Sequence, residues 1–590
     1  MCGIFGSIVN NSQNILPKIA KGISMLEYRG YDSVGIVVRT DDGTLVCEKQ
    51  VGTIADLAPL LKNIPTAQMG MGHTRWATHG TATRRNAHPH TNDTMAIVHN
   101  GTVTNTAELL AKINSKPISD TDSEVLMLYL CTLLEKMDMN SALLKLMEVA
   151  HGSFSAAFMH KDYDEMFLIC KGHHGLLLGK TDGEIHVSSD ASVLSHFSEE
   201  ICYLPPNHCY AVNAYGPSAK DGKPHEATWE AAPRQSKAIS GEYCHHFHRE
   251  IHEQVDMLKE IPSIRQKMSC ILPRNRRPIT LVGCGTSYYA ASIAEYWMSS
   301  FIPAHTYIGS EFVNTKWHGS AEDLVIFISQ SGETLDILEA MQHANVSTNL
   351  VITNRKHSAI TRITNHIINM EAGEEFSVAA TKTFTAQLCV LAQATLAMAE
   401  HYGYISSADY SKQIQQIIRP DLMSQVIGML ESEICEKISA HLSRSPMIFF
   451  LGRGQDYPLA QEGALKMKEV AYVPSEGVSM GEMKHGTLAL ANPSTPAIVI
   501  APYSEMLGKT LVGISEMQSR NVPVYVITDT KAQEYMTDNL SGVITLPHTN
   551  KYLSPILISP LLQWIAYKTA LKLGRSIDKP RNLAKSVTVT

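Results

Sequence analysis

The chain has 590 residues, more than one hydrophobic core usually supports, so several domains are expected. Its 44% hydrophobic and 18% charged residues are typical of a globular protein, and a net charge of −7 without a long basic run argues against a nucleic-acid or membrane partner. The 11 cysteines include no C-x-x-C pair, and MCGIFGSIVN has no signal-peptide pattern, which together favour reduced thiols and a cytoplasmic location.

The first part of the chain mixes strands and helices. Apolar runs at 94–98 and 166–169 predict strands, while 123–134 and 141–149 predict helices. After residue 213, the sequence AYGPSAKDGKPHEATWEAAPRQSKAI combines prolines, glycines and scattered charge with few apolar runs. We therefore expect a first domain over 1–213 and a linker over 214–240.

The second part has a different pattern, in which compact β-branched runs alternate with helix-like stretches. Such runs predict parallel strands that are buried on both faces. They occur in two series, at 279–282, 324–329 and 349–353, and at 446–451, 497–501 and 523–528. Each series opens with an apolar run that leads into a glycine turn, LVGCGTS and then FFLGRGQ, which indicates a weak internal repeat. We expect two α/β subdomains of one type, over 241–430 and 431–590.

The most apolar late segment, 554–573, contains Pro555, Pro560, Gln563 and Lys568. These residues favour a buried helix of a globular domain over a membrane span.

Cys2 is the first candidate catalytic residue. Removal of Met1 would give it a free α-amino group with a pKa near 7.7–8, able to accept the thiol proton. By itself this signal is weak, since a cysteine at this position is more often a small buried hydrophobe. The motifs that follow are EYRGYDS, HTRWATHG, NAHPH, HNG and DTDSE, in that order.

Together these motifs resemble the class II glutamine amidotransferase family. The resemblance implies an N-terminal-nucleophile hydrolase domain of α+β class, a four-layer αββα sandwich. It also implies a role for each matching residue. Cys2 would form a γ-glutamyl thioester, and Asn100 with the Gly101 amide would form the oxyanion hole. Arg75 would bind the glutamine carboxylate and Asp122 its ammonium group, with Thr78 and His79 as further contacts and Trp76 gating an ammonia passage.

A hydroxyl-rich turn follows one predicted strand of the second part. It reads Ser329-Gln330-Ser331-Gly332-Glu333-Thr334, and a second turn, Cys284-Gly285-Thr286-Ser287, follows the preceding strand. Hydroxyls, backbone N–H groups and a helix N-terminus suit a phosphate monoester, although a serine-rich turn alone is often an ordinary helix cap. Because the carboxyl ends of parallel strands share one sheet edge, we expect the two turns to converge.

These turns resemble the sugar isomerase (SIS) family, twice over, between about 245 and 590. The resemblance implies flavodoxin-like subdomains with parallel sheets. It assigns Ser329, Gln330, Ser331 and Thr334 to the phosphate, and Cys284, Thr286, Ser287 and the Val378 backbone to the sugar. The family usually has Val-Ala-Ser-Thr-Lys where this chain has Val378-Ala379-Ala380-Thr381-Lys382, so one sugar hydroxyl contact is missing.

Three later motifs carry charged groups: EGALKMKE (462–469), GEMKHG (481–486) and RNLAKSVTV (581–589). Glu462, Lys466 and Glu469 share one helix face, a pattern that in isolation indicates a solvated stripe. The three motifs resemble the amidotransferase family that aminates fructose 6-phosphate. The resemblance makes Glu469 the acid/base between C1 and C2, His485 the ring-opening residue, and Lys585 the Schiff-base amine assisted by Lys466.

The combined expectation is an enzyme that moves ammonia from L-glutamine to D-fructose 6-phosphate and isomerises the product to D-glucosamine 6-phosphate. The hydrogen shift is internal, so no cofactor is expected, and no metal site either. His245, His246, His248 and His252 lack ligand spacing and are expected on an exposed helix. The resemblance implies a homodimer through the isomerase halves.

Three alternative functions make different demands on the sequence. Other class II amidotransferases would need either an SGG-x-DS loop, which the sequence lacks, or an apolar strand that leads into paired aspartates in the second half. The near match to the second motif, Asp41-Asp42-Gly43, lies in the first domain and is predicted to be a turn. A non-catalytic phosphosugar sensor would be expected to lack Glu469, His485 and Lys585. An acceptor related to fructose 6-phosphate stays open because of Ala380.

Overall fold

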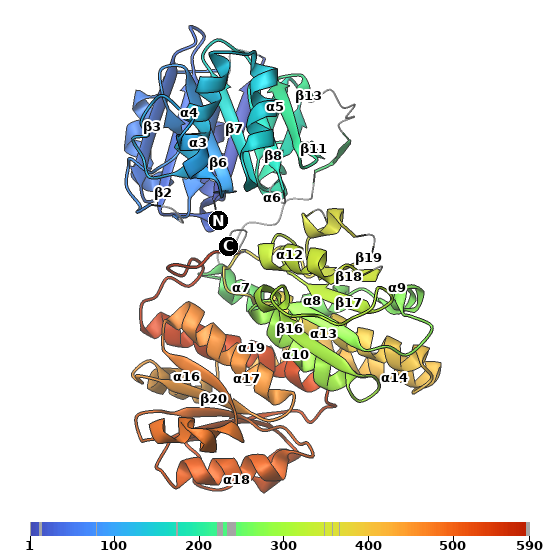
Figure 1. Cartoon of the computed structure of the whole chain (residues 1–590). Helices are drawn as coiled ribbons and strands as arrows, with labels where there is room; N and C mark the ends of the chain where they lie inside the picture. The colour runs from blue at the N-terminus through green and yellow to red at the C-terminus, as the bar shows by residue number, and fades with distance from the viewer. Residues whose placement is uncertain are drawn as a thin grey trace. The chain divides into compact units, whose positions relative to one another are not determined.

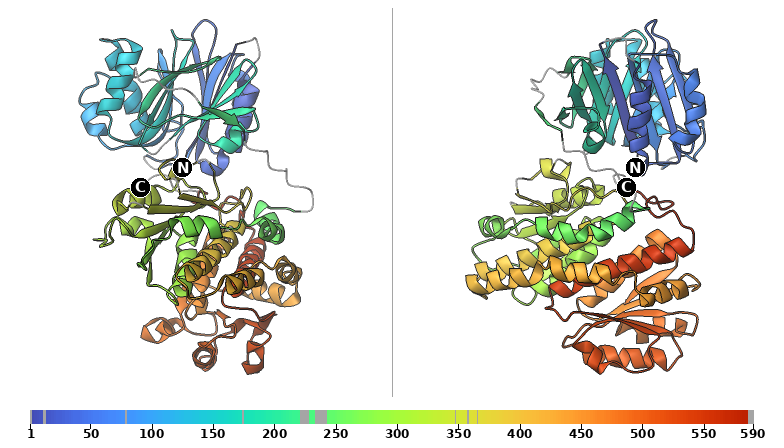
Figure 2. Two further views of the ribbon diagram at one scale, coloured as in Figure 1. Left: turned by 90° about the vertical axis from the view of Figure 1, so that its right-hand side faces the viewer. Right: turned by 180° about the vertical axis from the view of Figure 1, so that it is seen from behind.

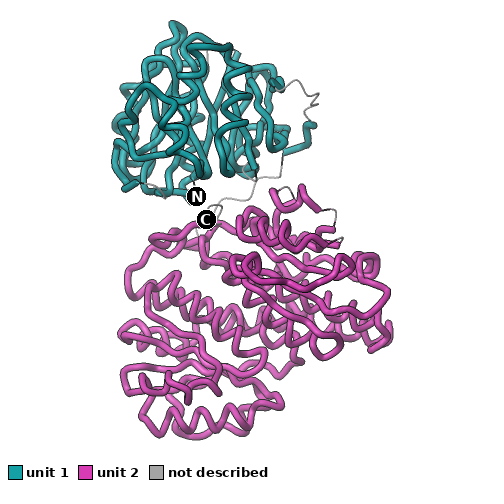
Figure 3. The backbone as a smooth tube through the Cα atoms, viewed as in Figure 1, with its two compact units in different colours: residues 1–237, 586–590 teal, residues 238–585 magenta. Residues whose placement is uncertain are grey.

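The computed structural model describes residues 2–10, 14–77, 80–172, 175–220, 228–232, 243–346, 348–356, 358–364 and 366–585. The chain divides into two compact units, one built on residues up to 237 and the other on 238–585 (Figure 3). Each unit has its own sheets and its own hydrophobic clusters. They are therefore described separately.

The first unit contains two antiparallel sheets (Figure 1). The eight-stranded sheet has the order β14-β11-β9-β10-β1-β4-β2-β3 and the six-stranded sheet the order β13-β12-β8-β7-β6-β5. The bounds of the first sheet's strands are β1 (Gly3–Val9), β2 (Ser33–Arg39), β3 (Leu45–Val51), β4 (Met69–Arg75), β9 (Leu177–Thr181), β10 (Glu184–Ser188), β11 (Glu200–Tyr203) and β14 (Trp229–Ala231). Those of the second are β5 (His90–Thr91), β6 (Met95–Val103), β7 (Gly152–His160), β8 (Met166–Lys171), β12 (His208–Asn213) and β13 (Gly216–Ala219).

Helices cover the outer faces of both sheets. The helices are α1 (Leu16–Met25), α2 (Ile54–Leu57), α3 (Thr106–Leu110), α4 (Asp122–Leu134), α5 (Met139–Val149) and α6 (Ala191–Leu194). One apolar cluster lies between the sheets, one joins α1 to the first sheet, and one joins α4 and α5 to the second. This is the four-layer αββα sandwich that the sequence resemblance implied, and the prediction is confirmed.

Two short strands lie in the range 214–240 that the sequence predicts as a linker. β13 pairs with β12, and β14 pairs with β11, so part of this range belongs to the first unit. Gly216 and Pro217 give β13 the composition of a linker, although both residue types are tolerated in an edge strand.

The second unit contains two five-stranded parallel sheets (Figures 1 and 2). Their orders are β16-β15-β17-β18-β19 and β21-β20-β22-β23-β24, the same 2-1-3-4-5 arrangement in each, which is the flavodoxin-like order. The strands are β15 (Ile279–Gly283), β16 (Ala304–Ile308), β17 (Leu324–Ile328), β18 (Thr348–Thr353), β19 (His366–Asn369), β20 (Ile448–Gly452), β21 (Ser475–Ser479), β22 (Ala497–Ile500), β23 (Val524–Asp529) and β24 (Gly542–Leu546). The predicted parallel sheets are confirmed, and the shared order supports the inferred repeat.

Long helices join the two sheets into one unit. The helices are α7 (His246–His252), α8 (Gln254–Glu260), α9 (Arg265–Ile271), α10 (Thr286–Met298), α11 (Gly309–Phe312), α12 (Leu335–Ala344), α13 (Lys382–His401), α14 (Ser407–Ile417), α15 (Pro420–Gly428), α16 (Glu433–Leu442), α17 (Asp456–Lys466), α18 (Leu507–Gln518) and α19 (Leu553–Lys572). One apolar cluster includes residues of α10, α13, α17 and α19 together with strands of both sheets.

Helix α19 is almost entirely buried in this cluster, as the sequence predicts for 554–573. In the part of the chain that the structure describes, no helix has the length and apolar character needed to cross a membrane.

Candidate functional sites

Cys2 lies directly before β1, the strand between β4 and β10. The backbone N–H of Trp76 donates to the Cys2 sulfur at 3.3 Å, and the Arg29 guanidinium donates to the Cys2 carbonyl at 3.2 Å. Arg29 is itself held by the Asp190 carboxylate at 3.2 Å. Burial raises the pKa of the Cys2 thiol. A thiol with a raised pKa needs a base before it can attack, which is the task predicted for the α-amino group.

Asn100 and Gly101 lie side by side on β6, with the Asn100 side chain buried. The His73 Nε2 atom is 2.9 Å from the His99 carbonyl oxygen and 3.2 Å from Asn100 Oδ1. Burial lowers the pKa of His73 to about 3, so the ring is neutral, and Nε2 carries its proton because both neighbours are acceptors. The His73 bond therefore occupies the Asn100 oxygen and leaves the amide NH₂ as the end suited to an oxyanion.

Gly101 has a φ of +113°, and a Cβ at this position would meet the Ser153 carbonyl at 2.4 Å. Both the backbone angle and the close β7 backbone require glycine here.

The other predicted glutamine contacts come from neighbouring elements. Arg75 ends β4 and is buried, and its guanidinium donates to the Gly80 carbonyl at 3.3 Å. Asp122 begins α4 and accepts the Val103 N–H at 2.9 Å. Burial lowers the pKa of Arg75, while the electrostatic influence of Cys2, Asp32 and Asp122 opposes this change. The indole of Trp76 packs edge-on against Tyr31. Thr78 and His79 fall outside the described residues.

The predicted phosphate turn follows β17, and the Cys284–Ser287 turn follows β15. These strands are parallel neighbours with Gly283 opposite Ile328, so both turns leave the same sheet edge. Ser329 Oγ accepts the Gly332 N–H and lies 3.1 Å from the Thr334 hydroxyl, directly before α12.

Gly332 has a φ of +65°, and a Cβ there would lie 2.1 Å from Ser358 Oγ. Gln330 is held through its carbonyl, which accepts the Asn354 N–H at 3.1 Å, and Ser331 Oγ accepts the Glu333 N–H at 3.1 Å. The turn is thus a compact cluster of hydroxyls and N–H groups at a helix N-terminus, an arrangement suited to a phosphate.

Glu462 and Lys466 of this stripe are buried rather than solvated, and Glu469 is half-buried. The Lys466 side chain is 0% exposed, and its ammonium lies 3.3 Å from Glu462 and 2.5 Å from Glu469. It also donates to the Thr286 hydroxyl at 3.2 Å, which links the stripe to the first sheet's turn.

Burial alone would lower the pKa of Lys466, but the two carboxylates raise it; burial raises the pKa of Glu462 to about 7. Glu469 lies on a π-helical turn (Met467–Ala471) that follows α17, a feature frequent at functional sites.

Lys585 is 7% exposed and forms an ion pair with Glu375, which is fully buried. Burial alone would raise the pKa of Glu375, but Lys585 and several hydrogen-bond donors lower it to about 2. The Val378 N–H, proposed for the sugar, donates to the Asp578 carbonyl at 3.1 Å. Cys284 is half-buried, and burial raises the pKa of its thiol to about 11.

Ser287 accepts a hydrogen bond from Gln387 at 3.0 Å. His485 is exposed on a short 3₁₀ turn (Glu482–His485), and among the described residues no hydrogen bond or ion pair links it to Lys466 or Lys585.

Sequence reasoning missed several residues that hold these groups. Arg29 and His73 lie inside motifs that were recognised, but nothing in their spacing shows that they contact Cys2 and Asn100. Glu250 and Glu375 carry no motif. The prediction that the histidine-rich helix is exposed is wrong. Four residues of α7 are buried: Phe247, Arg249, Glu250 and Ile251. Within the described ranges, no three potential ligand side chains are grouped as a metal ion would require.

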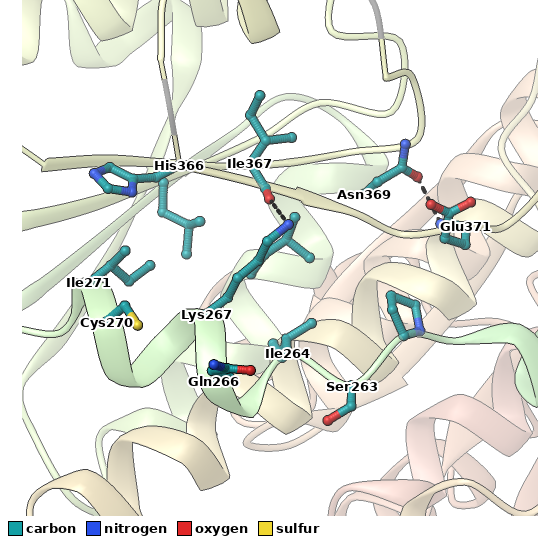
Figure 4. Close-up of a pocket in the computed structure, with 13 residues that line it drawn as sticks. Ser263, Ile264, Gln266, Lys267, Cys270, Ile271, His366, Ile367, Asn369 and Glu371 are labelled. Atoms are coloured by element: carbon teal, nitrogen blue, oxygen red, sulfur yellow. Dashed lines mark hydrogen bonds between the residues drawn. The ribbon is translucent and has the colours of Figure 1, made fainter.

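A pocket of about 560 Å³ lies between α9 and the edge strand β19 (Figure 4). The Lys267 ammonium donates to the Ile367 carbonyl at 2.7 Å across it. None of the predicted site residues lines this pocket.

The comparisons with known proteins cover both units. The model of class II glutamine amidotransferases matches residues 37–172, and the SIS domain model matches 274–397 and 441–573. A glutamine–fructose-6-phosphate aminotransferase (isomerizing) of Agrobacterium fabrum is 33% identical, and one of Xylella fastidiosa is 36% identical, with both chains covered completely in each case. The C-terminal domain of glucosamine-fructose-6-phosphate aminotransferase from Francisella tularensis is 29% identical with a TM-score of 0.53, covering 58% of this chain and all of that one.

Proposed function

The chain belongs to the isomerizing glutamine–fructose-6-phosphate aminotransferases, and from this premise we propose that it makes glucosamine 6-phosphate and glutamate from fructose 6-phosphate and glutamine. The observation that carries the proposal is the similarity to these relatives along both full lengths, because it includes a glutamine-hydrolysing and a sugar-isomerising half in one chain. The reaction is the first step of hexosamine synthesis.

In the first half, we assign the nucleophile to Cys2. Its sulfur attacks the glutamine amide carbon while the α-amino group takes the thiol proton and passes it to the amide nitrogen, which leaves as ammonia when the thioester forms. Water then hydrolyses the thioester, which releases glutamate and restores the thiol. Asn100 and the Gly101 N–H stabilise the tetrahedral oxyanion, a contribution of about 2.7–4 kcal/mol for one such donor. The buried Arg75 and Asp122 bind the carboxylate and ammonium of glutamine, with Thr78 and His79 as further predicted contacts. These assignments are supported by the burial of Arg75 and by the adjacent positions of Asn100 and Gly101 on β6.

In the second half, the hydroxyls of Ser329, Ser331 and Thr334 with Gln330 bind the phosphate, and Cys284, Thr286, Ser287 and Val378 contact the sugar. His485 opens the ring, and Lys585 forms an imine at C2 of the ketose. Ammonia replaces the lysine at C2. Glu469 then moves a proton from C1 to C2, and its ion pair with the buried Lys466 orients it.

Ammonia must reach the sugar without meeting bulk water, which would protonate it. We assign this transfer to a closed passage gated by Trp76. We also propose that the enzyme works in the cytoplasm, since Cys2 must stay reduced, and that it dimerises through residues 241–590 as the family resemblance implies.

The test is product formation by the purified protein with glutamine or with free ammonia as the nitrogen donor. We expect glucosamine 6-phosphate and glutamate in equal amounts with glutamine. Cys2→Ala should release no glutamate but retain the ammonia-dependent reaction. Glutamate release by Cys2→Ala would overturn the assignment of the first half, and glutaminase activity without any amino sugar would overturn that of the second.

A further inference from the structure

A pair of buried carboxylates lies behind Lys585. Glu375 and Glu250 are both fully buried, Glu375 on the segment before α13 and Glu250 on α7. The Thr381 hydroxyl lies between them, 2.9 Å from Glu375 Oε1 and 3.0 Å from Glu250 Oε2. Lys585 contacts the other oxygen of Glu375. The four groups therefore form a continuous chain from the amine to Glu250.

When both acids are ionised, this chain has fewer hydroxyl protons than oxygen acceptors, so the doubly ionised state readily takes up a proton. Thr381 has one hydroxyl proton for two carboxylate oxygens, and Ser377 has one for Glu250 Oε2 and the Ala379 carbonyl. If both carboxylates were charged, oxygen lone pairs would face each other without a proton between them. A proton on Glu250 Oε2 removes this shortage. Glu250 suits the task because burial and the neighbouring Glu375 raise its pKa to about 7.

The charged surroundings of Glu250 separate its behaviour from that of Glu375. Lys585 and Lys382 lie near it, Arg249 is its neighbour on α7, and Glu253 pairs with both Lys382 and Arg249. Each acid accepts two backbone N–H groups, Glu250 those of Phe376 and Ser377 and Glu375 those of Thr381 and Thr383. Glu375 also forms the direct ion pair with Lys585, so Glu375 stays ionised. The pair thus has one acid that keeps its charge and one that can gain or lose a proton.

We propose that Glu250 is a positioning residue that accepts the proton which Lys585 must lose before it attacks the sugar. This inference rests on the imine-forming role of Lys585 proposed above. The ammonium gives one proton to Glu375, the Thr381 hydroxyl relays it, and Glu250 receives it. The neutral amine then attacks C2 of the open ketose, forming the N–C2 bond, and the carbonyl oxygen leaves as water with the two remaining amine protons. When Glu250 is already protonated, this acceptor is filled, so the step requires ionised Glu250.

The experiment measures imine formation at Lys585 in the full-length protein with fructose 6-phosphate and no nitrogen donor. The imine is reduced with cyanoborohydride, located by mass spectrometry, and timed between pH 6 and pH 9. In the wild type, the rate of imine formation should rise with pH around pH 7 and reach a plateau above it. This rising part of the pH profile is called the limb. Glu250→Gln keeps the shape and hydrogen bonds of the protonated acid, so it should fold; its rate should be at least about tenfold lower at pH 8 and lack the limb.

Ser377→Ala is the matched variant. It keeps the Glu250 carboxylate but removes a hydrogen bond that lowers the pKa of Glu250, so the limb should persist and move to higher pH. Glutamate release at Cys2 should be unchanged in both variants, and a wild-type Tm of the second unit in calorimetry checks that the mutated unit is folded. A limb retained in Glu250→Gln, or unmoved in Ser377→Ala, would overturn the proposal. Absence of any imine at Lys585 in the wild type would instead overturn the role of Lys585, and this inference with it.

Discussion

Replacement of Lys466 by methionine should destabilise the second unit strongly. The Lys466 ammonium is fully buried, and its removal leaves Glu462 with the Thr286 hydroxyl as its remaining hydrogen-bond partner. Breaking a buried ion pair from one side costs about 3–5 kcal/mol. Unfolding entropy of about 2.1 cal/mol/K per residue over a unit of roughly 350 residues converts this to a fall in Tm of about 4–7 °C.

The loss of stability caused by Lys466→Met should also depend on pH. The pKa of Glu462 in the folded protein, about 7, lies above its ordinary value of 4.5. Such a group binds a proton on folding, so its contribution is fully present below about pH 4.5 and is lost as pH rises through the folded pKa. Lys466 lowers the pKa of Glu462, so the pKa of Glu462 should rise further in Lys466→Met. The loss of stability in Lys466→Met should therefore be greater at pH 8 than at pH 5.5.

Calorimetry of Lys466→Met, Glu462→Gln and the double variant at both pH values tests this reasoning. The double variant has no unpaired buried charge at position 462, so it should recover part of the lost stability. Glutamate release should persist in all three. A wild-type Tm for Lys466→Met would refute the reasoning. So would a double variant that is no more stable than Lys466→Met at pH 8.

Three further predictions concern single side chains. Lys585→Arg should stop glucosamine 6-phosphate formation while thioester formation at Cys2 continues; unchanged synthesis, measured by product assay, would contradict the role of Lys585. Gly101→Ala should lower glutaminase kcat at least about tenfold, since a Cβ would lie 2.4 Å from the Ser153 carbonyl and displace the oxyanion amide; a normal kcat would show that the site tolerates it. His73→Ala should lower glutaminase kcat by about 10- to 100-fold with a smaller change in KM, because the Asn100 amide loses the bond that orients it; equal changes in KM and kcat would point to general disorder instead.

Much of the fold could be predicted because local patterns are sufficient for it. Continuous β-branched runs such as 324–329 fit parallel strands buried on both faces, and the structure has β17 at that place. The turns after β15 and β17 share an edge because the strands are parallel neighbours. The strands β13 and β14 were missed because short edge strands have little hydrophobic signal of their own.

The candidate sites were predictable from the motifs in identity but not in environment. Helical spacing places Glu462 and Lys466 on one face, yet the same spacing fits a solvated stripe; burial in the α10, α13, α17 and α19 core decides between the two. Glu250 has no sequence signal at all. Its neighbours Glu375 and Lys585 come from distant segments of the chain, and their contact exists only in the folded unit.

The sequence by itself determined most of the elements and the order of the two halves, and it predicted the candidate reactive groups, because hydrophobic period, turn composition and motif are properties of neighbouring residues. The tertiary structure decided which charges are buried, which histidine contacts Asn100, and which acid of the Glu250–Glu375 pair has the raised pKa. Desolvation and charge–charge energies depend on every group packed around a side chain, and those groups are brought together only by the fold.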